Sequence, residues 1–333
     1  MKFELMIKNE DKLYIPVVSD GVKWTTNRKC SPGKLTFTVI KDGVIKLTEG
    51  DHVRLTVDNK GLFFGYVFTQ KRDKKQQIEV TASDQLRYLS NKDTYVYKNK
   101  TASDVIKMVA ADFNLNLGTI DQTEFTIEQR VESDTSLFDV IYNALDLEFS
   151  HKKKLYVLFD DFGKLTLKSL DNMKVDIMID AVTGENFDYS TSIDEGTFNV
   201  VKYAYGSNKP AGTKVVFAPP VRFENGKRVF SESQKQWGIL QYFLKETGVV
   251  KNEAQAQEKA NALLSLYNVK TRRLKITKAL GDVRVRAGSL VYVKLDLGDV
   301  EVKKYMWVEQ CEHTFNESEH WMDLTLRGGG FVA

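Results

Sequence analysis

The sequence predicts a mainly β protein with α+β insertions: two related antiparallel β-barrel domains, a small α+β domain and a helical insertion. Apolar and polar residues alternate at period two near both ends of the chain, and glycine or Asp-Gly pairs separate these runs. Helical periodicity is found between them. Short alternating strands with regular turns favour a barrel or sandwich, whereas a change of period indicates an α+β segment.

These changes of period divide the chain into four predicted regions. We expect a first β-barrel domain at residues 1–95 and an α+β domain at 96–185. The second β-barrel domain takes residues 186–230 and 268–333, and the helical insertion takes 231–267. A chain of 333 residues is long for one hydrophobic core, which also favours several domains.

The clearest β pattern runs from Leu280 to Leu326, and a weaker copy lies near the N-terminus. Aligning Gly50 with Gly288 superimposes two apolar runs, each ending in aspartate: Val53, Leu55, Val57 and Asp58 on Val291, Val293, Leu295 and Asp296. Residues 64–67 then match 305–308, and 78–80 match 322–324. Internal similarity of this kind indicates duplication, so we predict that one β unit occurs twice. The alternative is that any two strand–turn–strand segments look alike.

Other local signals predict individual elements. Asp42-Gly43 is a two-residue hairpin signal between the strands at 35–39 and 44–47. Thr101 and Asp104 form an approximate capping box, and Ser136 begins a second helix. Further along, residues 214–217 are expected to pair with 228–230 across Asn225-Gly226, and Asn252 is a good N-cap.

Composition excludes several classes of protein. A net charge of +3 argues against a dedicated nucleic-acid binder, which usually carries a strong basic excess. No segment approaches the roughly 18 apolar residues that span a bilayer. The start of the chain reads as a strand and not as a signal sequence, so we expect synthesis in the cytoplasm. Cys30 and Cys311 are then expected to be free thiols.

A search for catalytic chemistry predicts no catalytic, cofactor-binding or metal-binding residues. Cys311, His313 and His320 are the one metal-like cluster, but structural zinc usually needs four ligands in closer pairs. Residues 160–163 contain the kinase Asp-Phe-Gly triplet without its partner motifs, so a hairpin turn is expected. The Ser-x-x-Lys spacings at 31–34 and 150–153 also lack partners. Paired carboxylates for glycoside cleavage stay open, because their spatial separation cannot be read from sequence.

Together these segments resemble a known family. The order is the β unit, the helix at 101–106, the hairpin at 158–165, Tyr205-Gly206, the stretch Trp237–Tyr242 and an alanine-rich helix. It ends in the segment 279–293 and His313–Phe315. This order is similar to the XkdQ/YqbQ-type baseplate proteins of PBSX-like phage tails, which are related to the late control protein D tail hubs. The resemblance covers nearly the whole chain, and its most specific part is residues 281–293.

The resemblance implies a non-enzymatic hub at the centre of the baseplate of a contractile phage tail, or of a phage-tail-like bacteriocin (a tailocin). Such hubs are homotrimeric rings of subunits with two related barrels, which adapt a sixfold tail tube to a threefold spike. The expected partners are the tail tube or tube-initiator protein, the spike, baseplate wedge proteins and a peptidoglycan-binding or hydrolase tail protein. No cofactor, sequence-specific nucleic acid or membrane span is implied, and the expected location is the tail baseplate of the particle. The alternatives are a distal-tail or tube-tip adaptor and a tail-associated cell-wall glycan hydrolase.

Overall fold

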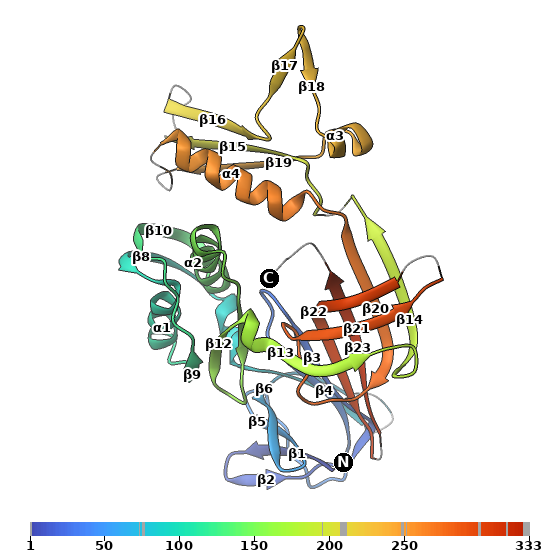
Figure 1. The fold of residues 1–333 in the computed structure, drawn as a ribbon. Helices are drawn as coiled ribbons and strands as arrows, with labels where there is room; N and C mark the ends of the chain where they lie inside the picture. The colour runs from blue at the N-terminus through green and yellow to red at the C-terminus, as the bar shows by residue number, and fades with distance from the viewer. Residues whose placement is uncertain are drawn as a thin grey trace. The chain divides into compact units, whose positions relative to one another are not determined.

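The chain forms two compact units (Figure 1). The computed structural model describes residues 2–72, 74, 77–194, 196–206, 212–247, 250, 252–298, 301–317 and 319–328. The first unit comprises Met1–Asp188 and Lys275–Leu326. The second unit comprises Tyr189–Leu274 and Arg327–Ala333, so most of it is inserted in the sequence of the first.

One sheet accounts for 13 strands of the described residues. They are β1 (Phe3–Asn9), β2 (Lys12–Tyr14), β3 (Val18–Asn27), β4 (Lys34–Ile40), β5 (His52–Val57), β6 (Lys60–Arg72), β7 (Gln77–Ser83), β13 (Lys174–Ile179), β14 (Gly184–Ser192), β20 (Thr271–Leu280), β21 (Leu290–Asp296), β22 (Glu301–Phe315) and β23 (His320–Gly328). The mainly β class predicted from period-two alternation is therefore confirmed.

The two halves of this sheet have the same strand order. The path runs β5-β6-β7-β4-β3 in one half and β21-β22-β23-β20-β14 in the other. If the five strands of each half are numbered in chain order, both halves have the spatial order third, fourth, fifth, second, first. An additional strand joins the outer edge of each half: β1 pairs antiparallel with β5, and β13 pairs parallel with β21.

A long strand joins the halves. One end of β22 pairs with β21, and its other end pairs with β3. Among the described residues the ladders follow an open path from β14 to β2. The closure of each half into a barrel, which the sequence led us to expect, is not seen.

The alternation in sequence becomes alternation in burial. Val53, Leu55 and Val57 point into the core from β5, and β21 buries Val291, Val293 and Leu295 in the same way. Successive side chains of a strand face opposite sides of a sheet, so this spacing places three apolar residues on one face. Full burial of each such side chain contributes about 1.5–3 kcal/mol.

The hairpin predicted at Asp42 and Gly43 is wrong, because residues 44–47 do not form a strand. Asp42 Oδ1 accepts hydrogen bonds from the amides of Val44 (2.9 Å) and Ile45 (3.0 Å). An aspartate that satisfies the amides following it turns the chain and competes with a sheet ladder.

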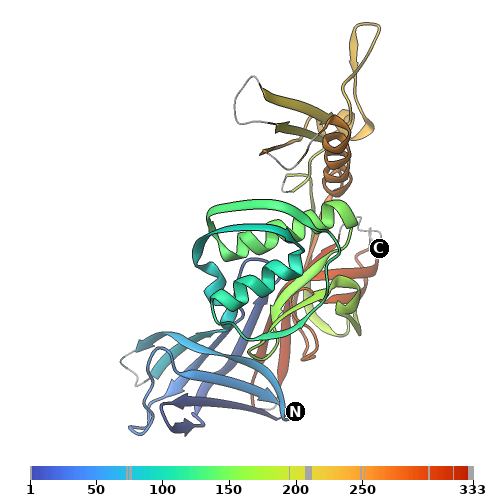
Figure 2. The same cartoon turned by 90° about the vertical axis from the view of Figure 1, so that its left-hand side faces the viewer.

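An α+β module lies between β7 and β13 in the sequence. It contains 3₁₀ helices η1 (Gln85–Ser90) and η2 (Leu170–Met173), helices α1 (Ala102–Asp112) and α2 (Leu137–Lys152), and strands β8 (Lys92–Lys100), β9 (Leu117–Ile120), β10 (Ile127–Ser136), β11 (Tyr156–Asp160) and β12 (Leu165–Ser169). Figure 2 shows the two α helices side by side. Thr101 and Asp104 form the predicted capping box. Helix α2 begins directly after Ser136, where a second helix was predicted to start, and Ser136 is its N-cap.

The second unit contains a separate small sheet covered by a helix. Its elements are β15 (Val200–Gly206), β16 (Thr213–Ala218), β17 (Arg222–Glu224), β18 (Lys227–Val229), α3 (Glu232–Trp237), β19 (Gln241–Thr247) and α4 (Glu253–Tyr267). Strand β15 pairs antiparallel with β16 and parallel with β19. Ala256 and Ala260 of α4 are buried against Tyr203, which explains the small side chains at these positions.

One predicted pairing in this unit is wrong. Residues 214–217 pair with β15, whereas β18 forms its own two-stranded hairpin with β17. Asn225 and Gly226 both adopt positive φ in the turn between β17 and β18. The Asn-Gly signal was therefore correct for a hairpin, but the partner strand lies closer in sequence than expected.

None of the helices in the described part of the chain has the length and apolar character needed to cross a bilayer.

Candidate structural site: the junction at residues 281–289

The segment 281–289 forms a compact loop that leads into β21. Its turns close through hydrogen bonds from the amide of Val285 to the carbonyl of Asp282 (3.0 Å) and from Ser289 to Arg286 (3.0 Å). Ser289 Oγ also accepts from the amide of Arg286 at 3.1 Å. The loop therefore satisfies several of its own backbone groups.

The same turn occurs before β5. Gly288 N donates to Val308 O (2.7 Å), and Gly50 N donates to Val67 O (2.8 Å). The φ angles of Gly288 and Gly50 are +93° and +95°, values that favour glycine because other residues lack its freedom there. In return, Val308 N and Val67 N donate to the residue after each glycine, at 2.9 and 2.8 Å. The aligned glycines and valines thus occupy matching hydrogen-bonding positions.

Arg286 links this loop to the α+β module and to β3. Its Nη2 donates to the carbonyl of Asp160 at 2.7 Å. Its guanidinium lies 4.1 Å from the ring centroid of Phe159 and 5.5 Å from that of Trp24. The neighbouring Ala287 amide donates to Thr26 Oγ1 at 2.9 Å. Side chains from three parts of the first unit therefore meet at one loop, which we call the junction.

Close packing against a side chain of β11 explains Gly288 further. A Cβ atom at this position would lie 2.3 Å from Cγ1 of Val157 on β11, a separation that atoms do not tolerate. The loop and β11 can approach this closely because position 288 has no side chain.

Two buried carboxyl groups lie beside the junction. Asp84 accepts hydrogen bonds from the amides of Gly33 (2.8 Å) and Leu86 (3.0 Å). Asp160 accepts from the amide of Gly163 (2.7 Å) and from Nε2 of Gln85 (2.9 Å). Burial raises the pKa of both carboxyl groups, and the charge of Asp160 raises the pKa of Asp84 further.

The arrangement of these carboxyl groups is structural. Each aspartate binds backbone amides that hold a turn: Asp160 closes the turn that contains the Asp-Phe-Gly triplet, and Asp84 caps η1. Both side chains are buried. A glycosidase would instead need an acid and a base that reach a sugar in a cleft.

The structure brings together the metal-like cluster at Cys311, His313 and His320. His313 Nδ1 lies 2.8 Å from Nε2 of His320, while His313 Nε2 lies 2.8 Å from the carbonyl of Val285 and 3.1 Å from Cys311 Sγ. A neutral His313 that donates from Nε2 to Val285 O and accepts at Nδ1 fits these contacts. The cluster is therefore a hydrogen-bond chain, and the described residues contain no group of three or more ligands that could hold a metal.

Burial keeps these histidines neutral. Burial, together with the charge of His320, lowers the pKa of His313 to about 3. Burial also lowers the pKa of His320 to about 4. Burial likewise raises the pKa of the Cys311 thiol. Cys311 and the exposed Cys30 are both free, as predicted.

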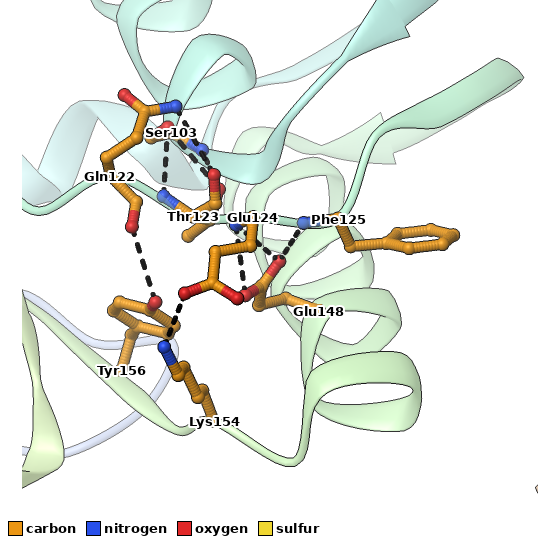
Figure 3. Close-up of polar contacts among 8 residues, drawn as sticks. All are labelled: Ser103, Gln122, Thr123, Glu124, Phe125, Glu148, Lys154 and Tyr156. Carbon is orange, nitrogen blue, oxygen red and sulfur yellow. Dashed lines mark hydrogen bonds and ion pairs between the residues drawn. The ribbon is translucent and has the colours of Figure 1, made fainter.

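A second buried polar cluster lies within the α+β module (Figure 3). Both carboxylate oxygens of Glu148 on α2 accept from the amide of Glu124 (3.1 Å each), and Oε2 also accepts from Phe125 (2.7 Å). Nearby, Thr123 Oγ1 accepts from the amide of Ser103 on α1 at 3.0 Å. The segment 121–126 is thereby attached to both helices.

The Ser-x-x-Lys spacing at 150–153 is used in contacts with the backbone. Lys153 Nζ donates to the backbone carbonyl of Ser150, whose hydroxyl donates to the Asp146 carbonyl. His151 stacks on Phe125 at 3.9 Å between centroids. The sequence search missed Arg286, Asp84 and Glu148. The position of Arg286 inside the most specific segment was the one available signal for this group.

Fold and site define a mainly β protein in which a repeated strand order meets an α+β module at a glycine-containing junction. The YqbQ-like family profile matches residues 22–327, and the chain belongs to that family. It is 29% identical to the phage-like element PBSX protein XkdQ of Bacillus subtilis over 95% of this chain and 94% of that protein. It is 30% identical to YqbQ of the same organism, over 97% of this chain and 96% of YqbQ.

A solved structure shares this fold. The prophage MuSo2 43 kDa tail protein of Shewanella oneidensis matches with a TM-score of 0.69 and 10% identity, over 97% of this chain and 98% of that one. The resemblance to XkdQ and YqbQ proteins expected from the residues is thus confirmed.

Proposed function

We propose that this protein is a structural component of a phage-type tail, and specifically the central hub of the baseplate of a contractile tail or phage-tail-like bacteriocin. It acts as a homotrimeric ring that adapts a sixfold tail tube to a threefold spike. Membership of the YqbQ-like family, the similarity to a PBSX protein and the fold shared with a prophage tail protein support this assignment.

The observation that carries the proposal is the repeat within the first unit. Both halves of the large sheet have the same strand order, and both contain the glycine turn at Gly50 or Gly288. Three copies of such a chain present six similar units, which lets a threefold ring match a sixfold neighbour. We assign the two halves to duplicated barrel domains, with the α+β domain between them in sequence.

The ring needs equivalent surfaces from both halves. Strands β5 and β21 occupy the same place in the two strand orders, and we propose that they take equivalent places around the ring. The tail tube or tube-initiator protein then binds one face and the spike the other, with wedge proteins and a peptidoglycan-binding or hydrolase tail protein nearby. The proposed role is mechanical and non-enzymatic.

The mass of the purified chain in solution, measured by light scattering with and without a spike partner, tests the hub. A trimer supports it, whereas a hexamer favours a distal-tail or tube-tip adaptor. An image of the assembled particle with this chain at the centre of the baseplate would decide its position. Clearing of peptidoglycan by the pure chain, lost on substitution of a single Asp or Glu, would contradict the non-enzymatic role.

A further inference from the structure

The second unit contains a pocket of about 210 Å³ whose lining is rich in arginine. It lies where β14 ends, β20 begins and β23 ends, three strands that are neighbours in the sheet. Arg272 and Arg273 contribute from β20, and Arg327 contributes from β23. All residues that line the pocket belong to the second unit.

Hydroxyl groups complete the lining. Ser190 and Ser192 come from β14, and Thr271 opens β20. Thr271 Oγ1 donates to the carbonyl of Ser192 at 3.0 Å, which fixes the two strand ends to one another. Ser192 Oγ accepts from the amide of Asp194 at 3.0 Å, so its own hydrogen is available to a ligand.

Two of the three arginines of the pocket, Arg272 and Arg327, carry charges that are not paired within the part of the chain that the structure describes. No carboxylate of the described residues forms an ion pair with Arg272 or Arg327, and both side chains are exposed. Guanidinium groups that line one pocket repel one another, and an anion placed between them removes that repulsion. Arginine also matches the oxygens of carboxylate and phosphate through two parallel N–H donors.

We propose that this pocket binds an oxyanion, either a carboxylate of a partner polypeptide or a phosphate, between Arg272 and Arg327. The serine hydroxyls supply further donors to the same oxygens. The inference concerns the chain itself and does not depend on the tail-hub proposal, because the binding can be measured on the isolated protein.

Isothermal titration calorimetry of the full chain tests this site with two probes, inorganic phosphate and a hexaglutamate peptide, at constant ionic strength set with chloride. We expect saturable binding of at least one probe. Arg272→Gln and Arg327→Gln should each weaken it about tenfold or more, since each removes charged hydrogen bonds. Arg222→Gln, which changes an exposed arginine of the same unit outside the pocket, should bind as the wild type does.

The two probes separate the sources of the anion. Tighter binding of the peptide indicates a partner carboxylate, and tighter binding of phosphate indicates the free ion. Absence of saturable binding for both probes overturns the site, and so does equal weakening in Arg222→Gln.

A labelling experiment on the wild-type chain guards against variants that fold poorly. Phenylglyoxal modifies accessible arginines, and mass spectrometry locates the modified positions. The bound probe should protect Arg272 and Arg327 at least several-fold while Arg222 stays reactive. Equal modification of these arginines with and without the probe would overturn the proposal.

Discussion

Gly288 and Gly50 share nearly the same φ but have different surroundings. A Cβ at Gly288 would meet Val157 at 2.3 Å, whereas one at Gly50 would have no neighbour within 4 Å. We expect Gly50→Ala to cost only the strain of a positive φ, about 1–2 kcal/mol. Gly288→Ala should cost that and about 1–3 kcal/mol more, because β11 must move away from the loop.

Denaturant unfolding of the two alanine variants measures this difference. Because the backbone penalty is common to both, the difference between the variants isolates the contact at the junction. Equal losses of stability would show that the loop and β11 do not pack as described.

His313 and His320 give the folded chain a pH dependence at the scale of single residues. The folded-state pKa values of about 3 and about 4 lie below the ordinary value of 6.5. At pH values between the folded-state pKa and 6.5, each histidine binds a proton in the unfolded chain but not in the folded chain. The free energy of unfolding contributed by these histidines is therefore fully present above pH 6.5. It falls as the pH drops toward 4 for His320 and toward 3 for His313.

His313→Phe should reduce this dependence. At pH 5 the free energy of unfolding of the wild type should be roughly 2 kcal/mol lower because of His313. This follows from a loss of about 1.4 kcal/mol for each pH unit below 6.5. The variant is less stable at pH 7, because Val285 O and His320 Nε2 lose a partner. Its free energy of unfolding should nevertheless fall by less than that of the wild type between pH 7 and pH 5. Charges that face the site, Asp282 and Arg286, are present in both chains. Identical losses in chemical denaturation at the two pH values would contradict neutral burial of His313.

At the scale of elements, Glu148 holds the segment 121–126 against α2. Glu148→Gln keeps the shape of the side chain but replaces a carboxylate with two acceptor oxygens by an amide with one. The backbone amides of Glu124 and Phe125 then compete for that single oxygen. We expect a loss of about 1–3 kcal/mol in urea unfolding, the cost of a buried amide left without a partner. Glu124→Gln is the matched control. It breaks an exposed contact with Lys154 and should change stability little. Equal effects of the two variants would refute the assigned role of Glu148.

Elements were predictable from sequence where their signals are local. The N-caps Thr101 and Asn252 and the start of a helix at Ser136 were identified correctly, because a side chain and an amide three residues away decide where each helix begins. The prediction of a hairpin at Asp42 was wrong, since the same Asp-Gly signal also fits an aspartate that accepts hydrogen bonds from the amides that follow it.

The junction could be predicted only in part. Its loop was found through glycine and alternation, which are visible in sequence. The contact of Arg286 with Asp160 was not found, because it depends on how β11 packs against the loop. Charged residues that meet through tertiary packing leave no periodic signal in a single sequence.

At the scale of the whole molecule, the two compact units provide a further test. Each has its own core: in the second unit Ala256 and Ala260 pack against Tyr203 and its neighbours, and in the first the apolar residues of β5 and β21 are buried. Units with separate cores can unfold in separate cooperative steps. Scanning calorimetry should therefore resolve two transitions, each sensitive to substitutions in its own unit.

Two core substitutions assign these transitions. Ala260→Leu inserts a larger side chain between α4 and its sheet and should destabilise the second unit by about 1–3 kcal/mol. Gly288→Ala should lower the other transition, because the junction lies entirely within the first unit. A single transition that both variants lower by the same amount would mean that the units unfold together. The junction would then stabilise the whole chain, and Gly288→Ala would loosen the second unit as strongly as the first.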